Sequence, residues 1–357
     1  MAATAEVQRA QEAGRATVLR PGIVALALAC LVAAAGAGVL VGPAGLPAGA
    51  VIRELLNRLP FVQVHSGLSH LDAAIIWQIR VPRVVLAGLV GAMLATAGAS
   101  YQGVFRNPLA DPYLLGVAAG AGLGATLAVA FASANGEGLF GLLPLAAFAG
   151  ALAAVGATYV LGRSAARSRN TATLILAGVA VTAFFTAVQT YVQQQHADTL
   201  REVYAWILGG LGTANWTQVV LILPYVGATI VVLLLHRRLL DVMSLGDEEA
   251  DSLGIRANRV RLTVVVAATL GTAAAVAVSG LIGFVGIIVP HTIRLLAGSS
   301  YRRILPLALM FGAAFLILAD LVARTALSPA EIPIGIITAF VGAPFFLLVL
   351  RRTRRVL

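Results

Sequence analysis

One short acidic segment has the composition of a docking element rather than of a catalytic site. Asp247, Glu248 and Glu249 are consecutive, and carboxylates in the first turn of a helix are stabilised by its dipole, while Gly254 is a residue type that ends helices. We therefore predict a short helix here. It is either a solvated loop element or a docking element for a soluble partner. The residues concerned are Leu245, Gly246, Asp247, Glu248, Glu249, Ala250, Leu253 and Gly254.

A second candidate site consists of arginines at the ends of apolar runs. Arg80 and Arg83 are three residues apart, which puts them on one side of a helical turn. Arg324 follows Asp320 by four residues, the spacing of an intrahelical ion pair. These arginines either form structural pairs or receive carboxylates from a protein that docks on this side.

The third candidate is irregular backbone between apolar runs. Arg106-Asn107-Pro108 opens a tight turn, and the stretch 280–294, which contains Pro290 and His291, is typical of a broken helix. Unpaired backbone groups cost several kcal/mol in lipid, so such segments must be buried in protein or line a cavity. We expect a gate or a pathway here, with His291 as a structural histidine or a proton relay.

The composition excludes several chemistries. All 25 basic residues are arginine, so a phosphate-binding loop with lysine and a Schiff-base lysine are absent. Cys30 is the single cysteine, and the five histidines lack metal-ligand spacing, so neither an internal disulfide nor a metal site is expected. The net charge of +10 does not indicate nucleic-acid binding, because the arginines lie at the ends of apolar runs. We predict no catalytic residue.

The elements that must position these residues are membrane helices. Hydrophobic residues make up 59% of the 357 positions and charged residues 11%, and the mean hydropathy is +0.92. About 20 apolar residues span a bilayer as a helix. We therefore predict an all-α polytopic membrane protein with ten spans, of which the eighth is short. The spans are 21–42, 84–105, 112–133, 139–162, 171–195, 216–236, 262–282, 283–297, 304–323 and 334–350.

Arginine placement predicts the topology. With ten spans and a cytoplasmic N-terminus, nineteen arginines are inside and six outside, in agreement with the positive-inside rule. Residues 1–20 then form a cytoplasmic tail and 21–357 a single transmembrane domain, with a cytoplasmic segment at 237–261. Three arginines before the first apolar run also suit a signal peptide, but the run is too long for one, so we expect a retained span.

At these residues the chain resembles the FecCD-like permeases of binding-protein-dependent ABC importers for iron chelates, haem and cobalamin. One departure is Ser300-Tyr301, where an Asp-His pair is usual. The blocks that carry the resemblance are Arg80-x-Pro82-Arg83, Gly98-x3-Gln102, Arg106-Asn107-Pro108-Leu109-Ala110-x-Pro112, Leu115-Gly116, Leu245-Gly246 to Leu253-Gly254, Phe284-Val285-Gly286, Pro290-His291-x2-Arg294, Asp320-x3-Arg324, Glu331-x-Pro333-x-Gly335 and Gly342-x-Pro344-Phe345-Phe346.

The resemblance implies a type II importer permease that forms a homodimer in the bacterial inner membrane, with both termini cytoplasmic. Two ATP-binding subunits would dock on residues 245–254 and would hold the ATP and Mg, so this chain would be no enzyme and bind no cofactor. A periplasmic binding protein would deliver cargo, and Arg80, Arg83 and Arg324 match the family's docking positions. The acidic segment at 245–254 and the absence of lysine independently favour ATP hydrolysis in partner subunits rather than in this chain.

The cargo is weakly encoded. Arg201 could pair with a haem propionate at the periplasmic entrance, and Tyr191 and His196 are further candidates for cargo contact; interfacial anchoring is the alternative. We favour haem on overall similarity, followed by a ferric siderophore and then cobalamin. An ion-coupled secondary transporter would need acids near mid-bilayer, and apart from Asp320 the spans contain essentially none. A structural or receptor membrane protein would not need the broken helix.

Overall fold

The structure is a computed structural model that describes residues 19–58, 60, 63–132, 139–164 and 171–353. These residues are helices and connecting turns, and the only β-type pairing among them is an isolated bridge between Leu327 and Ala330. The predicted cytoplasmic tail falls almost entirely on residues 1–18, outside the described residues.

Apolar helices dominate the described chain, and seven of them are long and apolar enough to cross a membrane. Three shorter apolar helices bring the number to the ten that we predicted. The ten helices are α2 (Pro21–Leu40), α5 (Val81–Val104), α6 (Val117–Ala132), α7 (Leu139–Ser164), α8 (Thr171–Gln195), α10 (Trp216–Met243), α12 (Ala257–Ser279), α13 (Val285–Ala297), α14 (Tyr301–Thr325) and α15 (Ile334–Thr353).

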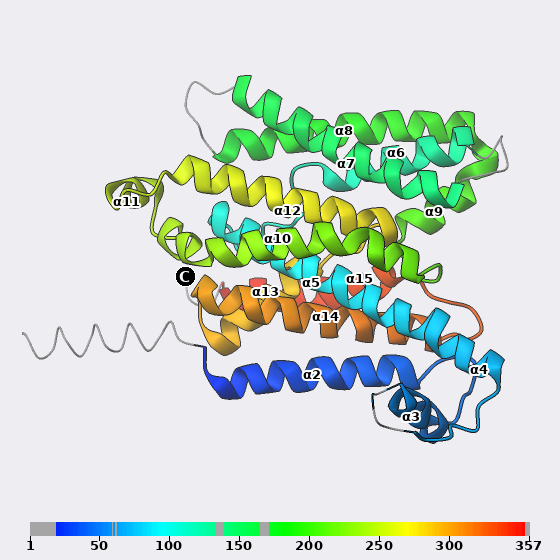
Figure 1. Ribbon diagram of the computed structural model, residues 1–357. Coiled ribbons are helices and arrows are strands. Elements are labelled where there is room, and N and C mark those ends of the chain that lie inside the picture. The colour runs from blue at the N-terminus through cyan, green and yellow to red at the C-terminus, as the bar shows by residue number, and fades with distance from the viewer. Residues whose placement is uncertain (1–18, 59, 61–62, 133–138, 165–170, 354–357) are drawn as a thin grey trace, which may run out of the picture.

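The ten helices form one bundle around α5, as Figure 1 shows. Helix α5 is buried along nearly its whole length and packs against α10, α12, α13 and α14. Helix α2 covers one edge of the bundle beside α14, and α6, α7 and α8 form the opposite edge. The centre of the molecule is therefore the group of helices that surrounds α5.

Close contacts between glycines hold α5 in this position. A Cβ on Gly98 would lie 2.1 Å from the carbonyl oxygen of Gly286 in α13, so the two backbones touch there. Gly120 of α6 meets Gly150 of α7 in the same way. Small residues allow such approaches where lipid supplies no hydrophobic drive. At these positions the glycines serve close packing between helices of one bundle.

The remaining elements are short and lie at the ends of the bundle. Helix α11 (Asp247–Ser252) is at one end, and Figure 1 places α3, α4 and α9 at the other. These elements, apart from α11, were not predicted from the sequence. They are α3 (Ala48–Asn57), α4 (His70–Ala74), the π-helical turn η1 (Ile75–Arg80), the 3-10 turn η3 (Ala197–Thr199) and α9 (Leu200–Ile207).

Several predicted span boundaries were wrong. Two errors fall on the predicted cytoplasmic segment 237–261, because α10 continues to Met243 and α12 already begins at Ala257. Two others concern irregular backbone. We predicted a span at 112–133, but α6 begins at Val117, because residues 105–116 form consecutive turns. We predicted that the seventh span would reach residue 282, but α12 ends at Ser279, where Gly280 takes a φ of +67°. Residues 280–284 thus separate α12 from α13.

Candidate functional site

Helix α11 forms a projection at its end of the bundle. Gly246 and Gly254 flank it with φ values of +149° and +78°, so the predicted helix and its glycine stop are confirmed. The long α12 begins three residues after Gly254, at Ala257. Leu245 and Leu253 are 67% and 63% exposed. Two exposed leucines beside exposed acids suit a surface that a soluble partner covers.

Asp247 ties this projection to the bundle. Its carboxylate accepts hydrogen bonds from Nη2 of Arg261 at 2.8 and 2.9 Å, and Nη2 of Arg106 lies 3.4 Å from its Oδ1. The side chain of Arg261 is largely buried, whereas that of Arg106 is exposed. Glu248 and Glu249 remain exposed. One acid therefore positions α11, and the other two are free for a partner.

The turn that begins at Arg106 closes the end of α5. Arg106 has a φ of +50°, and the amide of Asn107 donates to the carbonyl oxygen of Gln102 at 3.2 Å. The Asn107 side chain accepts from the amide of Leu109 at 2.9 Å, while Pro108 is exposed. The predicted tight turn is confirmed. Its role in gating stays a prediction.

The break at 280–284 lines an apolar cavity of about 550 Å³, as expected for irregular backbone at membrane depth. Phe284 has a φ of +68° and packs so closely on α15 that a Cβ on Gly342 would meet its ring at 2.3 Å. The lining residues are Ile207, Leu208, Leu281, Gly283, Phe284, Gly335, Ile336, Ala339, Phe340 and Ala343.

The proline and histidine of the predicted gate lie inside α13. Pro290 is buried within the helix. The ring of His291 makes an edge contact with Phe345 of α15, with 5.7 Å between the centroids. His291 thus has an aromatic neighbour, as the structural alternative requires. This contact joins α13 to α15, and α15 lines the cavity.

Sequence reasoning missed a polar cluster between α5, α13 and α14. Arg294 donates to the side-chain oxygen of Gln102 and to the hydroxyl of Tyr301, and the amide of Gln102 donates to the carbonyl oxygen of Gly286. Asp241 accepts from the side chain of Ser300 and the amide of Tyr301. The unusual Ser300-Tyr301 pair therefore anchors the start of α14. The motif Pro290-His291-x2-Arg294 was the only sign of this cluster in the sequence. It did not indicate which residues Arg294 contacts.

The arginines of the second candidate site are buried. Arg83 donates to Asp320 and to Glu331 at distances from 2.8 to 3.0 Å. Arg80 donates to the carbonyl oxygens of Val39 and Leu40, and Arg324 to that of Gly38. The i,i+4 pair of Asp320 and Arg324 is present at 3.5 Å. In this conformation all three arginines contact partners inside the bundle. Their role in docking stays a prediction.

This network predicts a loss of stability in acid. Hydrogen bonds from Arg83 lower the pKa of Glu331 below its usual value. A depressed carboxyl pKa stabilises the folded state above the usual value of about 4.3, and this contribution disappears as the pH falls through the folded-state pKa. We expect the melting temperature in nanodiscs to fall as the pH is lowered below about 4.3. The variant Glu331→Gln should show a flatter profile over that range, and an unchanged profile would contradict the assignment.

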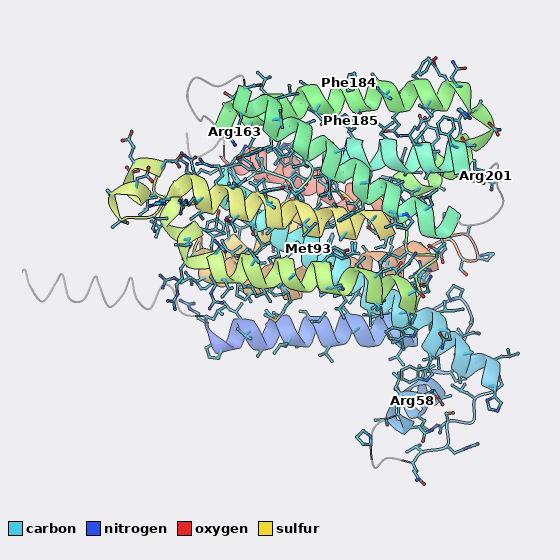
Figure 2. All side chains as sticks on the ribbon, turned by 45° about the horizontal axis from the view of Figure 1, so that its top comes forward. Arg58, Met93, Arg163, Phe184, Phe185 and Arg201 are labelled. Carbon is cyan, nitrogen blue, oxygen red and sulfur yellow. The ribbon has the colours of Figure 1, made fainter. Side chains whose placement is uncertain are left out.

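The candidate cargo residues lie at the end of the bundle opposite α11. Figure 2 places Arg201 there, on the exposed side of α9. Tyr191 is 63% exposed near the end of α8. His196 is partly buried and makes an edge contact with Phe131 at 4.9 Å between centroids. The side chains of Arg201 and Tyr191 are accessible to a ligand, whereas the ring of His196 packs against Phe131.

A family model agrees with this arrangement over almost the whole chain. The model of the FecCD transport family matches residues 26–352. An uncharacterised ABC transporter permease, YvrB of Bacillus subtilis, is 43% identical over 79% of this chain and 80% of its own. The cobalamin import permease BtuC of Halobacterium salinarum is 42% identical over 80% and 75%. The hemin transport permease HmuU of Yersinia pestis is 40% identical over 78% and 84%.

Solved structures share the fold. One, assigned to a metal-chelate type ABC transporter in an inward-facing conformation, is 31% identical and superposes with a TM-score of 0.79 over 93% of this chain and 100% of its own. PsaBC of Streptococcus pneumoniae has a TM-score of 0.54 over 78% of this chain and 93% of its own. Because its identity is 15%, that likeness concerns the fold alone.

Proposed function

This chain belongs to the FecCD transport family, as a permease subunit of an ABC importer for iron chelates, haem, siderophores or cobalamin, and we propose that its cargo is haem. The observation that carries the importer assignment is the family match over residues 26–352. The matched residues include the buried arginine network, the break at 280–284 and the projection formed by α11.

Energy enters through α11 in this proposal. Two ATP-binding subunits dock on the exposed Leu245 and Leu253 and on the acids Glu248 and Glu249, and they alone hold ATP and Mg. The chain itself catalyses no reaction. Support for this comes from the exposure of the projection and from the absence of lysine in the sequence.

The protein lies in the bacterial inner membrane with the α11 end of the bundle on the cytoplasmic side. Both termini lie on that side. Arg163 lies toward this end in Figure 2, and α2 begins there in Figure 1. Basic residues next to the apolar helices favour the cytoplasmic side. The opposite end, with α3, α4 and α9, then faces the periplasm.

A homodimer completes the translocation path. Helix α8 exposes Leu176 and Phe184, and α15 exposes Phe340, which is 74% accessible. The cavity beside the break is open and is lined partly by α15. A second copy that covers these faces would enclose the cavity on the dimer axis.

A periplasmic binding protein docks at the α3, α4 and α9 end. If Arg80, Arg83 and Arg324 receive its carboxylates, they must first exchange internal partners. Glu331 is the internal carboxylate most open to solvent, with 41% of its side chain exposed, so it is the first that a docking carboxylate can replace.

Haem is favoured over other cargoes by the chemistry of the periplasmic end. Haem combines a large apolar ring with two propionates. Arg201 offers an exposed cation, and Tyr191 and Tyr204 offer exposed aromatic faces near it in sequence. The cavity next to the break is almost entirely apolar. The 42% identity to a cobalamin permease makes cobalamin the second candidate.

Cargo-stimulated ATP hydrolysis tests this choice. The permease is reconstituted in liposomes with its ATP-binding subunits, and binding proteins loaded with haem, a ferric siderophore or cobalamin are compared. We expect haem to stimulate most. We also expect Arg201→Ala to raise the half-saturating concentration of the haem-loaded protein by roughly fivefold, because an exposed ion pair contributes up to about 1 kcal/mol. Arg53→Ala, an exposed arginine at the same end, should change little. Stimulation by cobalamin or siderophore alone would contradict haem but not the importer assignment.

A further inference from the structure

Two irregular segments far apart in sequence meet inside the bundle. The hydroxyl of Tyr113 donates to the carbonyl oxygen of Ile282 at 3.0 Å and accepts from the amide of the same residue at 3.2 Å. Ile282 is 1% exposed and lies in the break between α12 and α13. One side chain therefore satisfies both backbone polar groups of a buried residue that has no helical partners, as a membrane interior requires.

The Tyr113 side chain is held in place by its own segment. Asp111 accepts from the amide of Tyr113 at 2.8 Å. Pro112 lies against α13 so closely that a Cβ on Gly286 would meet its ring at 2.6 Å. Consecutive turns, closed by hydrogen bonds from Ala110 to Asn107 and from Leu114 to Asp111, stiffen the stretch between Arg106 and Tyr113.

The other end of the same segment touches the projection. Arg106 forms an ion pair with Asp247 at the start of α11, at 3.4 Å. That pair is exposed, so it contributes little to stability. The pair nevertheless places one end of the segment beside α11. Residues 106–113, stiffened by their own turns, therefore connect α11 with the break beside the apolar cavity.

We propose that the hydroxyl of Tyr113 is a positioning group that couples movement of α11 to the break at residues 280–284. The inference rests on the proposed function, because it needs ATP-binding subunits that move α11. When they do, residues 106–113 shift as a unit, and the two hydrogen bonds to Ile282 carry that shift into the backbone that lines the cavity. The link is physical and continuous, from Asp247 through Arg106 and Tyr113 to Ile282.

The test compares Tyr113→Phe, which keeps the ring, with Tyr225→Phe, whose ring packs on Phe148 of α7. Each full complex, in liposomes and with haem as the probe, is assayed for haem delivered per ATP hydrolysed. We expect Tyr113→Phe to reduce this ratio roughly tenfold while hydrolysis continues, because two buried hydrogen bonds are lost. Tyr225→Phe should leave the ratio unchanged. An unchanged ratio in Tyr113→Phe, or an equal fall in transport and hydrolysis, overturns the inference.

Hydrogen exchange gives a second readout that does not depend on cargo. In the wild-type complex, ATP and Mg should change the exchange of a peptide that contains Ile282, and in Tyr113→Phe this exchange should be fast and insensitive to nucleotide. If that variant does not accumulate, a fluorinated tyrosine at position 113 replaces it; its hydroxyl is a weaker acceptor for the amide of Ile282 but a stronger donor to the carbonyl oxygen, so exchange of that amide should become faster. Exchange that responds to nucleotide equally in both proteins overturns the link. A wild-type complex that hydrolyses ATP but moves no haem contradicts the proposed function instead, and the exchange data still decide the link.

Discussion

Replacing Leu245 and Leu253 with glutamate is expected to weaken the binding of the ATP-binding subunits by roughly 100-fold, because two apolar contacts of about 1.5 kcal/mol each are lost. Both side chains are more than 60% exposed, so the substitution removes no internal packing and the permease should fold normally. The affinity is measured between purified ATP-binding subunits and the permease in nanodiscs. Haem-stimulated hydrolysis should fall in parallel.

The matched control is Leu71→Glu. Leu71 is 79% exposed, but it lies in α4 at the opposite end of the bundle, as Figure 1 shows for that helix. Its substitution should leave the affinity for the ATP-binding subunits unchanged. If the double variant binds them as tightly as the wild type, α11 is not the docking element, and energy must enter elsewhere.

Substituting Arg83 with alanine is expected to lower the free energy of unfolding by about 3–5 kcal/mol, the usual cost of leaving buried charges without their partner. Asp320, whose side chain is 1% exposed, would lose its bidentate partner, and Glu331 would lose both of its hydrogen bonds to Arg83. Unfolding is followed by denaturant titration in detergent micelles or nanodiscs. Combining Arg83→Ala with Asp320→Asn should recover part of the loss, because one unpaired charge is removed.

Arg53→Ala controls for a general effect of removing an arginine. Arg53 is exposed on α3 at the same end of the bundle, so its loss should cost less than about 0.5 kcal/mol. The Arg83 variant also separates the two interpretations of this arginine. If Arg83→Ala is as stable as the wild type but no longer binds the periplasmic binding protein, its role is docking rather than support of the bundle.

Much of the fold follows from local sequence. The ten apolar helices are evident from run length, since a bilayer imposes a minimum length on each. The α11 helix is evident because its acids and its glycine stop are neighbours in the chain. The break between α12 and α13, where Gly280 and Phe284 have positive φ values, is also a local feature. The glycines and the proline near it correctly predicted a break that lines a cavity.

The partners of the polar residues could not be predicted, because they come from distant parts of the chain. Arg83 pairs with Glu331, which is 248 positions away, whereas the four-residue spacing suggested Asp320 and Arg324 alone. The hydroxyl of Tyr113 bonds to Ile282 across 169 positions. Exposure likewise depends on tertiary packing, so sequence could not reveal that the arginines face the interior of the bundle.

The short elements at the ends were missed for a related reason. Helix α3 is ten residues long and α9 eight, so neither has the long apolar run that identifies a span. The start of α6 was placed five residues early, because residues 112–116 carry no charge and their composition resembles that of a span, although they form turns.

The central claim is that this protein forms a transport path and depends on a separate ATPase for energy. The most direct test is uptake of haem against a gradient into proteoliposomes that contain the permease with or without the ATP-binding subunits, with haem-loaded binding protein outside and ATP within. Accumulation only when both the subunits and ATP are present is the predicted result. Accumulation by the permease alone, driven by an imposed ion gradient, would contradict the claim.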